Sequence, residues 1–342
     1  MEPNWLLYIA AFGCAFVVSL LMTPPARRLS IKVNAIDYPR ARGLNKEPIP
    51  RMGGVAIVAG FMVAMGMLLM FMPDLRTLQF IGFIVGGFVI ALLGMMDDIY
   101  QLRALTKLIG QIVAAIIIVA TGTRVTFLDS LFPAFLSRID IPITIIWIVG
   151  VTNAVNFIDG VDGLAAGVAS IACVSLTALC ILSGSGTAVV FAIALAGACL
   201  GFLPRNFSPA DVYMGDTGSM FLGYVLAVTS VIGVYKSAAL LTIVIAVLAL
   251  ALPIFDTVFA MLRRLITHKP IMEADRGHLH HKLIDKGYSH KKTVVILYLI
   301  SAVMGGIAVL IAVRDLRATV VAVVTIVVIL LVVFVYRKRV DK

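Results

Sequence analysis

The chain has 342 residues, of which 61% are hydrophobic and only 13% are charged. A soluble domain of this length does not need so much apolar surface, so the composition excludes a soluble enzyme and indicates an integral membrane protein. The formal net charge of +10 would suggest nucleic-acid binding in a soluble protein. Here we interpret it as the excess of Lys and Arg that orients membrane helices, and we expect no nucleic-acid partner.

Long apolar stretches predict about eleven membrane-spanning helices, because a helix needs about 20 apolar residues to cross the bilayer core. In chain order the stretches lie near residues 5–23, 53–72, 79–96, 105–121, 140–157, 163–183, 187–204, 218–234, 237–260, 293–313 and 317–336. The predicted fold class is therefore an all-α, polytopic membrane helix bundle, and we interpret residues 1–342 as one integral membrane domain. An odd number of spans places the two termini on opposite sides.

Positive charge is concentrated in alternate loops. Of the 28 Lys and Arg residues, 22 lie in the C-terminal tail and in segments 24–52, 97–107, 205–217 and 261–292. Because cytoplasmic loops carry the excess of Lys and Arg, we expect a cytoplasmic C-terminus and an N-terminus outside the cell. Together with the turn 157–163, these loops are expected to form an active site on the cytoplasmic face of a multi-pass protein of the cell membrane.

The third apolar stretch ends in two adjacent carboxylates, Asp97 and Asp98, within "GMMDDIYQ". Like charges repel, and a carboxylate beside hydrocarbon is costly to keep ionised. A cation is therefore expected next to the pair. Lys107, about one turn inside the fourth apolar stretch, could snorkel to the surface or receive the phosphate of a lipid.

A second acidic turn reads "NAVNFIDGVDGLAAG" over residues 153–167. Asn156, Asp159 and Asp162 recur every three residues, which places their side chains on one face of a helical turn. Carboxylate and amide oxygens suit Mg²⁺ or hydrogen bonds to a ribose and a base. The alternative is a solvated turn between two helices, with Asp as a cap.

The stretch "GDTGS", residues 215–219, opens the eighth apolar stretch. A glycine-rich turn that leads into a helix N-terminus is an anion site, since its free amides and the helix dipole both favour negative charge. Asp216 in that turn could hold a metal that bridges the same anion. The alternative is simple helix capping by one of the polar side chains.

Two basic segments complete the cytoplasmic face. His278, His280 and His281 lie in "ADRGHLHHKL", which has no HExxH pattern or cysteine pair to support zinc and fits pyrophosphate binding or contact with anionic lipid heads. Lys46 and Arg51 flank a proline-rich turn that suits either phosphate contact or membrane anchoring. Acids, Mg²⁺ and cations together are what phosphoryl transfer requires.

The motifs "MMDD", "NAVNFIDGVDGLAAG", "GDTGS" and "GHLHH", in this order in a many-helix protein, resemble the polyprenyl-phosphate N-acetylhexosamine-1-phosphate transferase family. The resemblance runs from Lys46 to His281. It implies ten or eleven helices, a homodimer, and transfer of a sugar 1-phosphate from a UDP-sugar to a polyprenyl phosphate with release of UMP. The implied cofactor is Mg²⁺, with Mn²⁺ as a substitute.

The resemblance also implies roles for individual residues. The catalytic group is Asp97, Asp98, Lys107, Asn156 and Asp159. The metal is assigned to Asp216 and Asp97, and the lipid phosphate to Asp98. For substrate binding the resemblance implies Asp162, Asn206, Tyr213, His280 and His281, and the two basic segments add Lys46, Arg51 and His278 to this group.

The histidine segment separates two branches of this family. The branch that transfers a muramoyl pentapeptide carries a longer segment similar to "PIHHHFE", and it commonly has Lys where this chain has Gln101. The chain therefore resembles the branch that uses UDP-N-acetylglucosamine and undecaprenyl phosphate at the first membrane step of a teichoic acid or O-antigen type glycan. The alternative within the family is a phospho-N-acetylmuramoyl-pentapeptide transferase.

Two other classes of protein share single features with this sequence. Residues 159–166 satisfy the DxxDGxxA pattern of CDP-alcohol phosphotransferases, but Gly167 replaces the expected Arg and no second acid pair follows. An ion-coupled transporter would place charges near the membrane midplane on broken helices. Here the carboxylates lie at the ends of the predicted helices, and only Asp256, which follows Pro253, lies inside an apolar stretch. A transporter is therefore the less favoured reading, kept as the alternative from another class.

Overall fold

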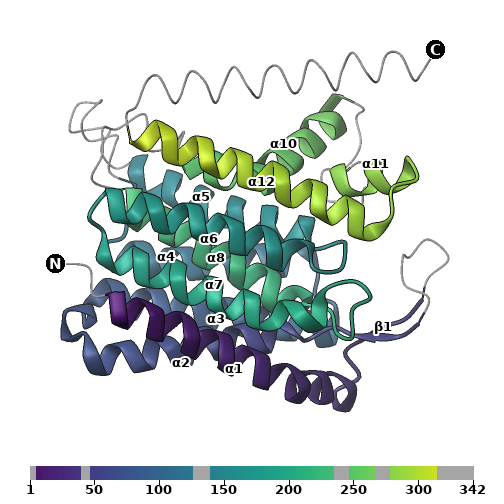
Figure 1. Cartoon of the computed structure of the whole chain (residues 1–342), viewed down its shortest axis with the longest axis horizontal. Helices are drawn as coiled ribbons and strands as arrows, with labels where there is room; N and C mark the ends of the chain where they lie inside the picture. The colour runs from purple at the N-terminus through teal and green to yellow at the C-terminus, as the bar shows by residue number, and fades with distance from the viewer. Residues whose placement is uncertain (1–4, 40–46, 126–138, 235–245, 267–277, 314–342) are drawn as a thin grey trace.

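The computed structural model describes residues 5–39, 47–125, 139–234, 246–266 and 278–313, which form an α-helical bundle (Figure 1). Within these ranges, eight helices are long and apolar enough to cross a membrane. They are α1 (Trp5–Lys32), α2 (Gly54–Phe71), α3 (Leu78–Tyr100), α5 (Asp140–Ile158), α6 (Leu164–Leu182), α7 (Gly186–Asn206), α8 (Gly215–Val234) and α12 (His290–Ala312). The remaining elements are β1 (Ile36–Asp37), β2 (Ile49–Pro50), the 3₁₀ helix η1 (Pro73–Leu75), α4 (Ala104–Ala120), α10 (Ala251–Ile266) and α11 (Leu279–Asp285).

The all-α membrane class is confirmed, whereas the number of eleven spans and the orientation of the termini stay predictions. The span expected near residues 317–336 lies outside the described residues. The span expected at 237–260 lies partly outside the described residues, and in its described part a turn at Leu250 precedes α10, which continues to Ile266. Pro253 has no backbone N–H and lies in the first turn of α10, which is a position where proline is tolerated.

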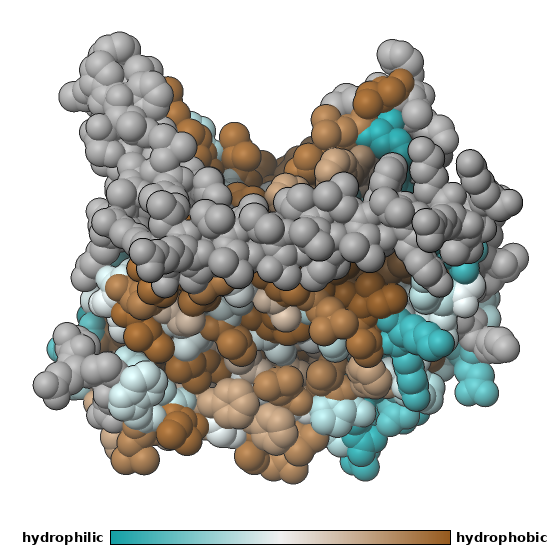
Figure 2. Space-filling view, turned by 45° about the horizontal axis from the view of Figure 1, so that its top comes forward, coloured by the Kyte–Doolittle hydropathy of each residue, from teal (hydrophilic) through white to brown (hydrophobic). Residues whose placement is uncertain are grey.

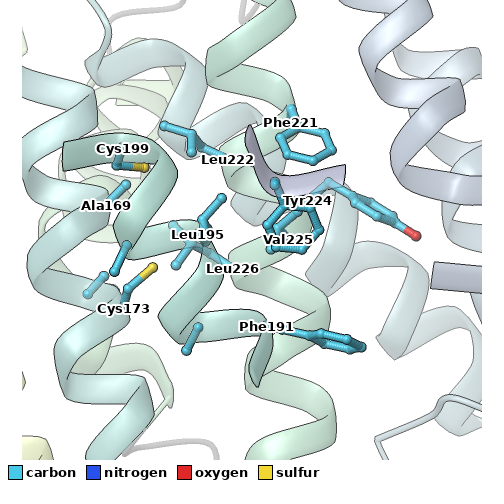
Figure 3. Packing of buried hydrophobic residues seen from close by; sticks show 14 of the residues in the cluster. Ala169, Cys173, Phe191, Leu195, Cys199, Phe221, Leu222, Tyr224, Val225 and Leu226 are labelled. Atoms are coloured by element: carbon cyan, nitrogen blue, oxygen red, sulfur yellow. The ribbon is translucent and has the colours of Figure 1, made fainter. Parts of the chain in front are cut away.

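Helix α8 is the centre of the bundle and packs against α2, α3, α5, α6 and α7. Figure 3 shows its aromatic and branched side chains interleaved with those of α6 and α7. The hydroxyl of Tyr224 points away from this group and donates to the backbone carbonyl of Phe83 at 3.1 Å. Gly94 allows α3 to approach closely, because a Cβ there would lie 2.5 Å from the Cα of Thr217. The central position of α8 fixes the residues at its N-terminus relative to these five neighbouring helices.

Some of the segments that are predicted to be cytoplasmic lie at one end of the bundle. In Figure 1 the hairpin of β1 and β2 and the short helix α11 lie at the same end, and the N-terminus of the chain lies at the opposite end. The space-filling view shows a broad hydrophobic face, with the strongest hydrophilic patch at one side (Figure 2). This distribution is what a multi-pass membrane protein presents to lipid and to water.

Backbone hydrogen bonds join the segment before α2 to the segment before α8. The N–H of Tyr213 donates to the carbonyl of Pro50 at 2.8 Å, and the N–H of Gly53 donates to the carbonyl of Tyr213 at 2.9 Å. The N–H of Gly54 then donates to the carbonyl of Met214 at 2.8 Å. Both helices therefore begin at one level.

Candidate active site

The carboxylate of Asp98, near the end of α3, caps the start of α8. Its Oδ1 accepts from the N–H of Asp216 at 2.9 Å, and its Oδ2 accepts from the N–H and the hydroxyl of Thr217 at 3.0 and 2.6 Å. Gly215 is required before these amides, because its φ is 70° and a Cβ would lie 2.6 Å from both Asp98 oxygens. A buried carboxylate satisfies the free amides and the dipole of α8. In the structure α8 thus engages both oxygens of Asp98, and the contact with a lipid phosphate that the resemblance implies stays a prediction.

Arg51 holds the other side of the same residue. Its Nε and Nη2 donate to the backbone carbonyl of Asp98 at 3.0 and 2.6 Å. The last carbonyls of a helix lack partners within the helix, and a guanidinium there complements the negative end of the dipole. Arg51 therefore clamps the segment before α2 to the end of α3. Lys46, its predicted companion, lies outside the described residues.

Four side chains from four helices form what we call the acid–lysine cluster: Asp97, Lys107, Asn156 and Asp216. The ammonium of Lys107 lies 3.1 Å from Oδ2 of Asp97 and 2.9 Å from Oδ2 of Asp216. The other oxygen of Asp97 accepts from the N–H of Leu102 at 2.7 Å, which fixes the carboxylate at the end of α3. The two acids thus converge on a single positive charge.

The amide of Asn156 completes the cluster from α5. Its Nδ2 donates to Oδ1 of Asp216 at 2.9 Å and to the hydroxyl of Ser219 at 2.7 Å. One turn deeper in the bundle, the side-chain amides of Gln111 and Asn153 bond each other, with donor–acceptor distances of 2.7 and 3.3 Å. Because Gln111 follows Lys107 by four residues and Asn153 precedes Asn156 by three, this amide pair locks the two helix faces that carry the cluster.

Asp159 follows α5 and faces the same group of acids. Burial raises the pKa of its carboxyl to about 8, and the nearby carboxylates of Asp216, Asp98 and Asp162 add to that shift. The carboxylate of Asp162 accepts from the N–H of Ala210 at 3.1 Å, so it also ties the turn after α5 to the segment between α7 and α8. An added cation would favour ionised Asp159, because it would offset this negative charge.

Asn206 is the last residue of α7, and Tyr213 lies on the segment that joins α7 to α8. The buried amide of Asn206 accepts from the N–H of Gly163 at 3.1 Å and donates to the carbonyl of Val212 at 3.0 Å, so it braces the backbone of two turns. Tyr213 is half-buried, and burial together with the charge of Asp162 raises the pKa of its hydroxyl. The hydroxyl therefore stays protonated and able to donate beside the acidic turn.

The second polar group, which we call the histidine cluster, comprises Asp256, His278, His280 and His281. Nδ1 of His278 lies 2.9 Å from Oδ2 of Asp256 on α10. The rings of His278 and His280 are parallel within 3°, with centroids 5.7 Å apart, and the rings of His280 and His281 are 4.3 Å apart. The three predicted histidines are thus adjacent to one another in the structure.

The histidine cluster packs against the turn that carries Asp159. The ring of His278 lies 6.1 Å from that of Phe157, and a Cβ on Gly160 would lie 2.6 Å from Nε2 of His280. Burial lowers the pKa of the His280 imidazole to about 4, and His281 adds to the shift, so His280 is neutral near pH 7. The acid–lysine and histidine clusters therefore lie on either side of one turn.

The donor set of the acid–lysine cluster fits Mg²⁺. Asp97 and Asp216 present hard oxygen donors to the same position, which is held by positive charge. Over the described ranges, no three His, Cys, Asp or Glu residues are close enough to form a complete cation site. Mg²⁺ is usually bound by one or two carboxylates, and water and phosphate oxygens complete its coordination shell, so the pair Asp97 and Asp216 is a sufficient set of protein ligands.

The sequence did not identify several residues that the structure joins to this site. Gln111 and Asn153 carry polar amide groups inside apolar stretches of the sequence. A polar residue in a membrane-spanning stretch indicates a functional or structural contact, so this pattern could have identified both residues. Asp256 was noted as the acid inside an apolar stretch, but its contact with His278 depends on the path of α10. Ser219 was considered only as a cap, whereas its hydroxyl accepts from Asn156.

Comparison with known proteins relates the chain to a family of glycosyl transferases. The family model described as "Glycosyl transferase family 4" matches residues 80–234, a range that includes the acid–lysine cluster. A probable undecaprenyl-phosphate N-acetylglucosaminyl 1-phosphate transferase of Bacillus subtilis is 36% identical over 305 residues, which cover 88% of this chain and 84% of the relative. A decaprenyl-phosphate N-acetylglucosaminephosphotransferase of Mycolicibacterium smegmatis is 34% identical over 318 residues, covering 83% of this chain and 77% of the relative.

A more distant relative extends the match. An undecaprenyl-phosphate alpha-N-acetylglucosaminyl 1-phosphate transferase of Thermotoga maritima is 28% identical over 281 residues, which cover 82% of this chain and 83% of the relative. The matched relatives therefore span most of the chain rather than one segment of it. The chain belongs to glycosyl transferase family 4, in the branch of the polyprenyl-phosphate N-acetylglucosamine-1-phosphate transferases.

Proposed function

We propose that the protein transfers N-acetylglucosamine 1-phosphate from UDP-N-acetylglucosamine to undecaprenyl phosphate and releases UMP. The observation that supports this most directly is the convergence of Asp97 and Asp216 on the ammonium of Lys107 at the ends of membrane helices. The names of the relatives describe the same acceptor and the same sugar phosphate. A lipid phosphate in the membrane and a soluble sugar nucleotide can both reach a site at such a boundary.

The reaction is an in-line displacement at phosphorus. An oxygen of the lipid phosphate attacks the phosphorus that carries the sugar, and a new phosphorus–oxygen bond forms there. The bond between this phosphorus and the oxygen that bridges the diphosphate breaks, and UMP leaves with that oxygen. Catalysis of such a step consists mainly of positioning the groups and offsetting their negative charge.

The acid–lysine cluster supplies residues for both tasks. Lys107 would draw a phosphate oxygen toward the cluster, and Asn156 holds Asp216 in place through a hydrogen bond of 2.9 Å. Asp216 and Asp97 would hold Mg²⁺, which when bound offsets the charge of the phosphate groups. Asp98 keeps the turn of Asp216 in register through its three hydrogen bonds to α8.

The donor would bind between the two clusters. Asp162 and Tyr213 would contact the nucleoside, and His278 and His280, which lie against Phe157 and Gly160, would contact the diphosphate. We place this site on the cytoplasmic face, because the basic loops predict that orientation and UDP-sugars are cytoplasmic. We further propose a homodimer that acts at the first membrane step of a teichoic acid or O-antigen type glycan.

An assay of UMP release tests the function. Purified protein in detergent would receive undecaprenyl phosphate, Mg²⁺ and either UDP-N-acetylglucosamine or UDP-N-acetylmuramoyl-pentapeptide. We expect UMP with the first donor only, and no UMP when the lipid is omitted. Efficient release from the pentapeptide donor would move the chain to the other branch of the family. Because detergent solution has no ion gradient, lipid-dependent turnover there also excludes a transporter as the source of activity.

A further inference from the structure

Asp256 is the acid that the sequence places inside an apolar stretch, and the structure gives both of its oxygens to the start of α11. Oδ2 lies 2.9 Å from Nδ1 of His278, and Oδ1 accepts from the backbone N–H of Leu279 at 2.8 Å. The side chain of Asp256 is 9% exposed and that of His278 is 10% exposed. An ionised carboxylate in such surroundings is costly unless it is paired and hydrogen-bonded, so the contact is specific.

These two contacts determine which nitrogen of His278 carries a proton. An ionised carboxylate has only acceptor oxygens, so Nδ1 of His278 must be the donor. In the neutral ring, Nε2 is then the nitrogen with a lone pair, and in the charged ring it is a second donor. The bond to Leu279 fixes the backbone next to the ring, so the carboxylate sets both the tautomer and the orientation of His278.

The orientation of His278 is passed on to His280. The two rings are parallel within 3°, and Nε2 of His280 is buried with no hydrogen-bond partner among the described residues. The same nitrogen faces Gly160, in the turn that also carries Asp159. A buried ring nitrogen without a partner is expensive in a finished fold, and it is explained if a substrate group completes the site.

We propose that Asp256 is a positioning residue of the transferase, which orients His278 and, through the parallel rings, His280 toward the diphosphate of the sugar nucleotide. This inference rests on the proposed function for the identity of the bound group. Asp256 does not itself touch substrate, and it acts through the imidazoles. Its effect should therefore fall on the donor and not on the lipid acceptor.

The first test reads the tautomer without any turnover. The chain has five histidines, so ¹⁵N-histidine labelling of the protein in lipid bilayers gives a small set of ring signals, and the His278→Gln variant identifies that of His278. In the wild type we expect a protonated Nδ1 at His278. Asp256→Asn should invert the pattern, because the amide group can present an N–H to Nδ1. A wild-type ring with unprotonated Nδ1, or an unchanged signal in the variant, would overturn the proposal.

The second test separates donor from acceptor kinetics. Asp256→Asn should raise the KM for UDP-N-acetylglucosamine about tenfold, the scale of one hydrogen bond to a charged group, and leave the KM for undecaprenyl phosphate within about twofold. The double variant with His278→Gln should be no slower than His278→Gln alone, since the two residues act in series. Additive losses, or equal losses for both substrates, would contradict the positioning role.

The control makes the same substitution at Asp285, an exposed residue of α11. Asp285→Asn should leave the His278 signal and the donor KM unchanged. Failure of the two hypotheses can be told apart. If the wild type shows the expected tautomer but releases no UMP, the proposed function fails and the contact of Asp256 with His278 stands. If UMP is released and the tautomer does not depend on Asp256, the positioning proposal fails alone.

Discussion

The acid–lysine cluster and the histidine cluster flank the same turn, yet they are built in different ways. The first draws its side chains from four packed helices, and every one of its charges meets another side chain within 3.1 Å. The second is held by one carboxylate from α10 and by stacked imidazole rings, and Nε2 of His280 has no hydrogen-bond partner among the described residues. In the first cluster the protein itself supplies a partner for every charge, whereas in the second one ring nitrogen has no protein partner among the described residues.

This difference separates two tasks of a transferase. Groups that offset charge in the transition state act best when they are preorganised, because reorganisation during the reaction costs free energy. Groups that recognise a donor gain specificity when the donor supplies the missing hydrogen bonds. We therefore expect substitutions in the acid–lysine cluster to lower kcat and substitutions at the histidine cluster to raise the donor KM.

The largest effect is expected at Asp216. Asp216→Asn removes a charge that faces Lys107 and that would hold the metal, so transfer should fall by about 10³-fold or more. The melting temperature in detergent should stay near the wild-type value, because the amide can still accept from Asn156. UMP release and a thermal unfolding curve measure both quantities. Near-normal turnover in this variant would remove Asp216 from the metal site.

Asp97 belongs to the acid–lysine cluster and its neighbour Asp98 caps α8, so the two residues separate a catalytic role from a structural one. Asp97→Asn should lower kcat about 10²-fold with a small change in stability. Asp98→Ala leaves the first amides of α8 without their acceptor, so it should cost about 2 kcal/mol of stability in addition to activity. Thermal unfolding of the two variants decides the assignment. Equal stability of both would show that Asp98 does not hold α8.

Gly160 offers a way to disturb the histidine cluster alone. In Gly160→Ala the new methyl group would lie 2.6 Å from Nε2 of His280, so the ring must move. We expect the donor KM to rise by about fivefold to tenfold, with kcat reduced less. Gly150→Ala is the matched control, because it lies on α5 and a Cβ there meets nothing within 4 Å. A fall in kcat at constant donor KM would place His280 with the catalytic groups.

The smallest effect is expected at the amide pair below the acid–lysine cluster. Gln111→Leu removes the hydrogen bonds to Asn153, and such bonds between membrane helices are worth about 0.6 kcal/mol on average. The variant should lose about this much stability and turn over about twofold to threefold more slowly, since Lys107 and Asn156 are held less firmly. Thermal unfolding and UMP release measure both. A gain in turnover would argue against the locking role of this pair.

Much of the fold and of the site could be predicted from patterns along the chain. The apolar stretches indicate helices because an all-helical backbone satisfies its own hydrogen bonds in lipid. The expected start of a helix at the "GDTGS" turn is confirmed, since α8 begins at Gly215. The acids at helix ends had to lie near cations for electrostatic reasons, and Lys107 is such a partner for Asp97.

The partners of individual side chains could not be predicted. Successive side chains on a helix point about 100° apart, so Asp97 and Asp98 had to face different neighbours, but only the packing of α3 shows that Asp98 faces α8. Asn206 looked like a residue for a ligand, yet two backbone groups use its amide. Asp256 stood out by its apolar surroundings, and its partner lies beyond a segment whose path the sequence does not give.

The backbone hydrogen bonds between residues 50–54 and residues 213–214 also determine the order in which parts of the fold can form during biosynthesis. The segment before α2 leaves the ribosome early, and its partner segment, residues 213–214, is made only after α7. Asp98 likewise waits for the amides of α8. Contacts between such distant parts of a chain form late, because the intervening chain must be made and ordered first. The helices of the first half can therefore enter the membrane one after another, but the acid–lysine cluster forms only when α8 is inserted among them.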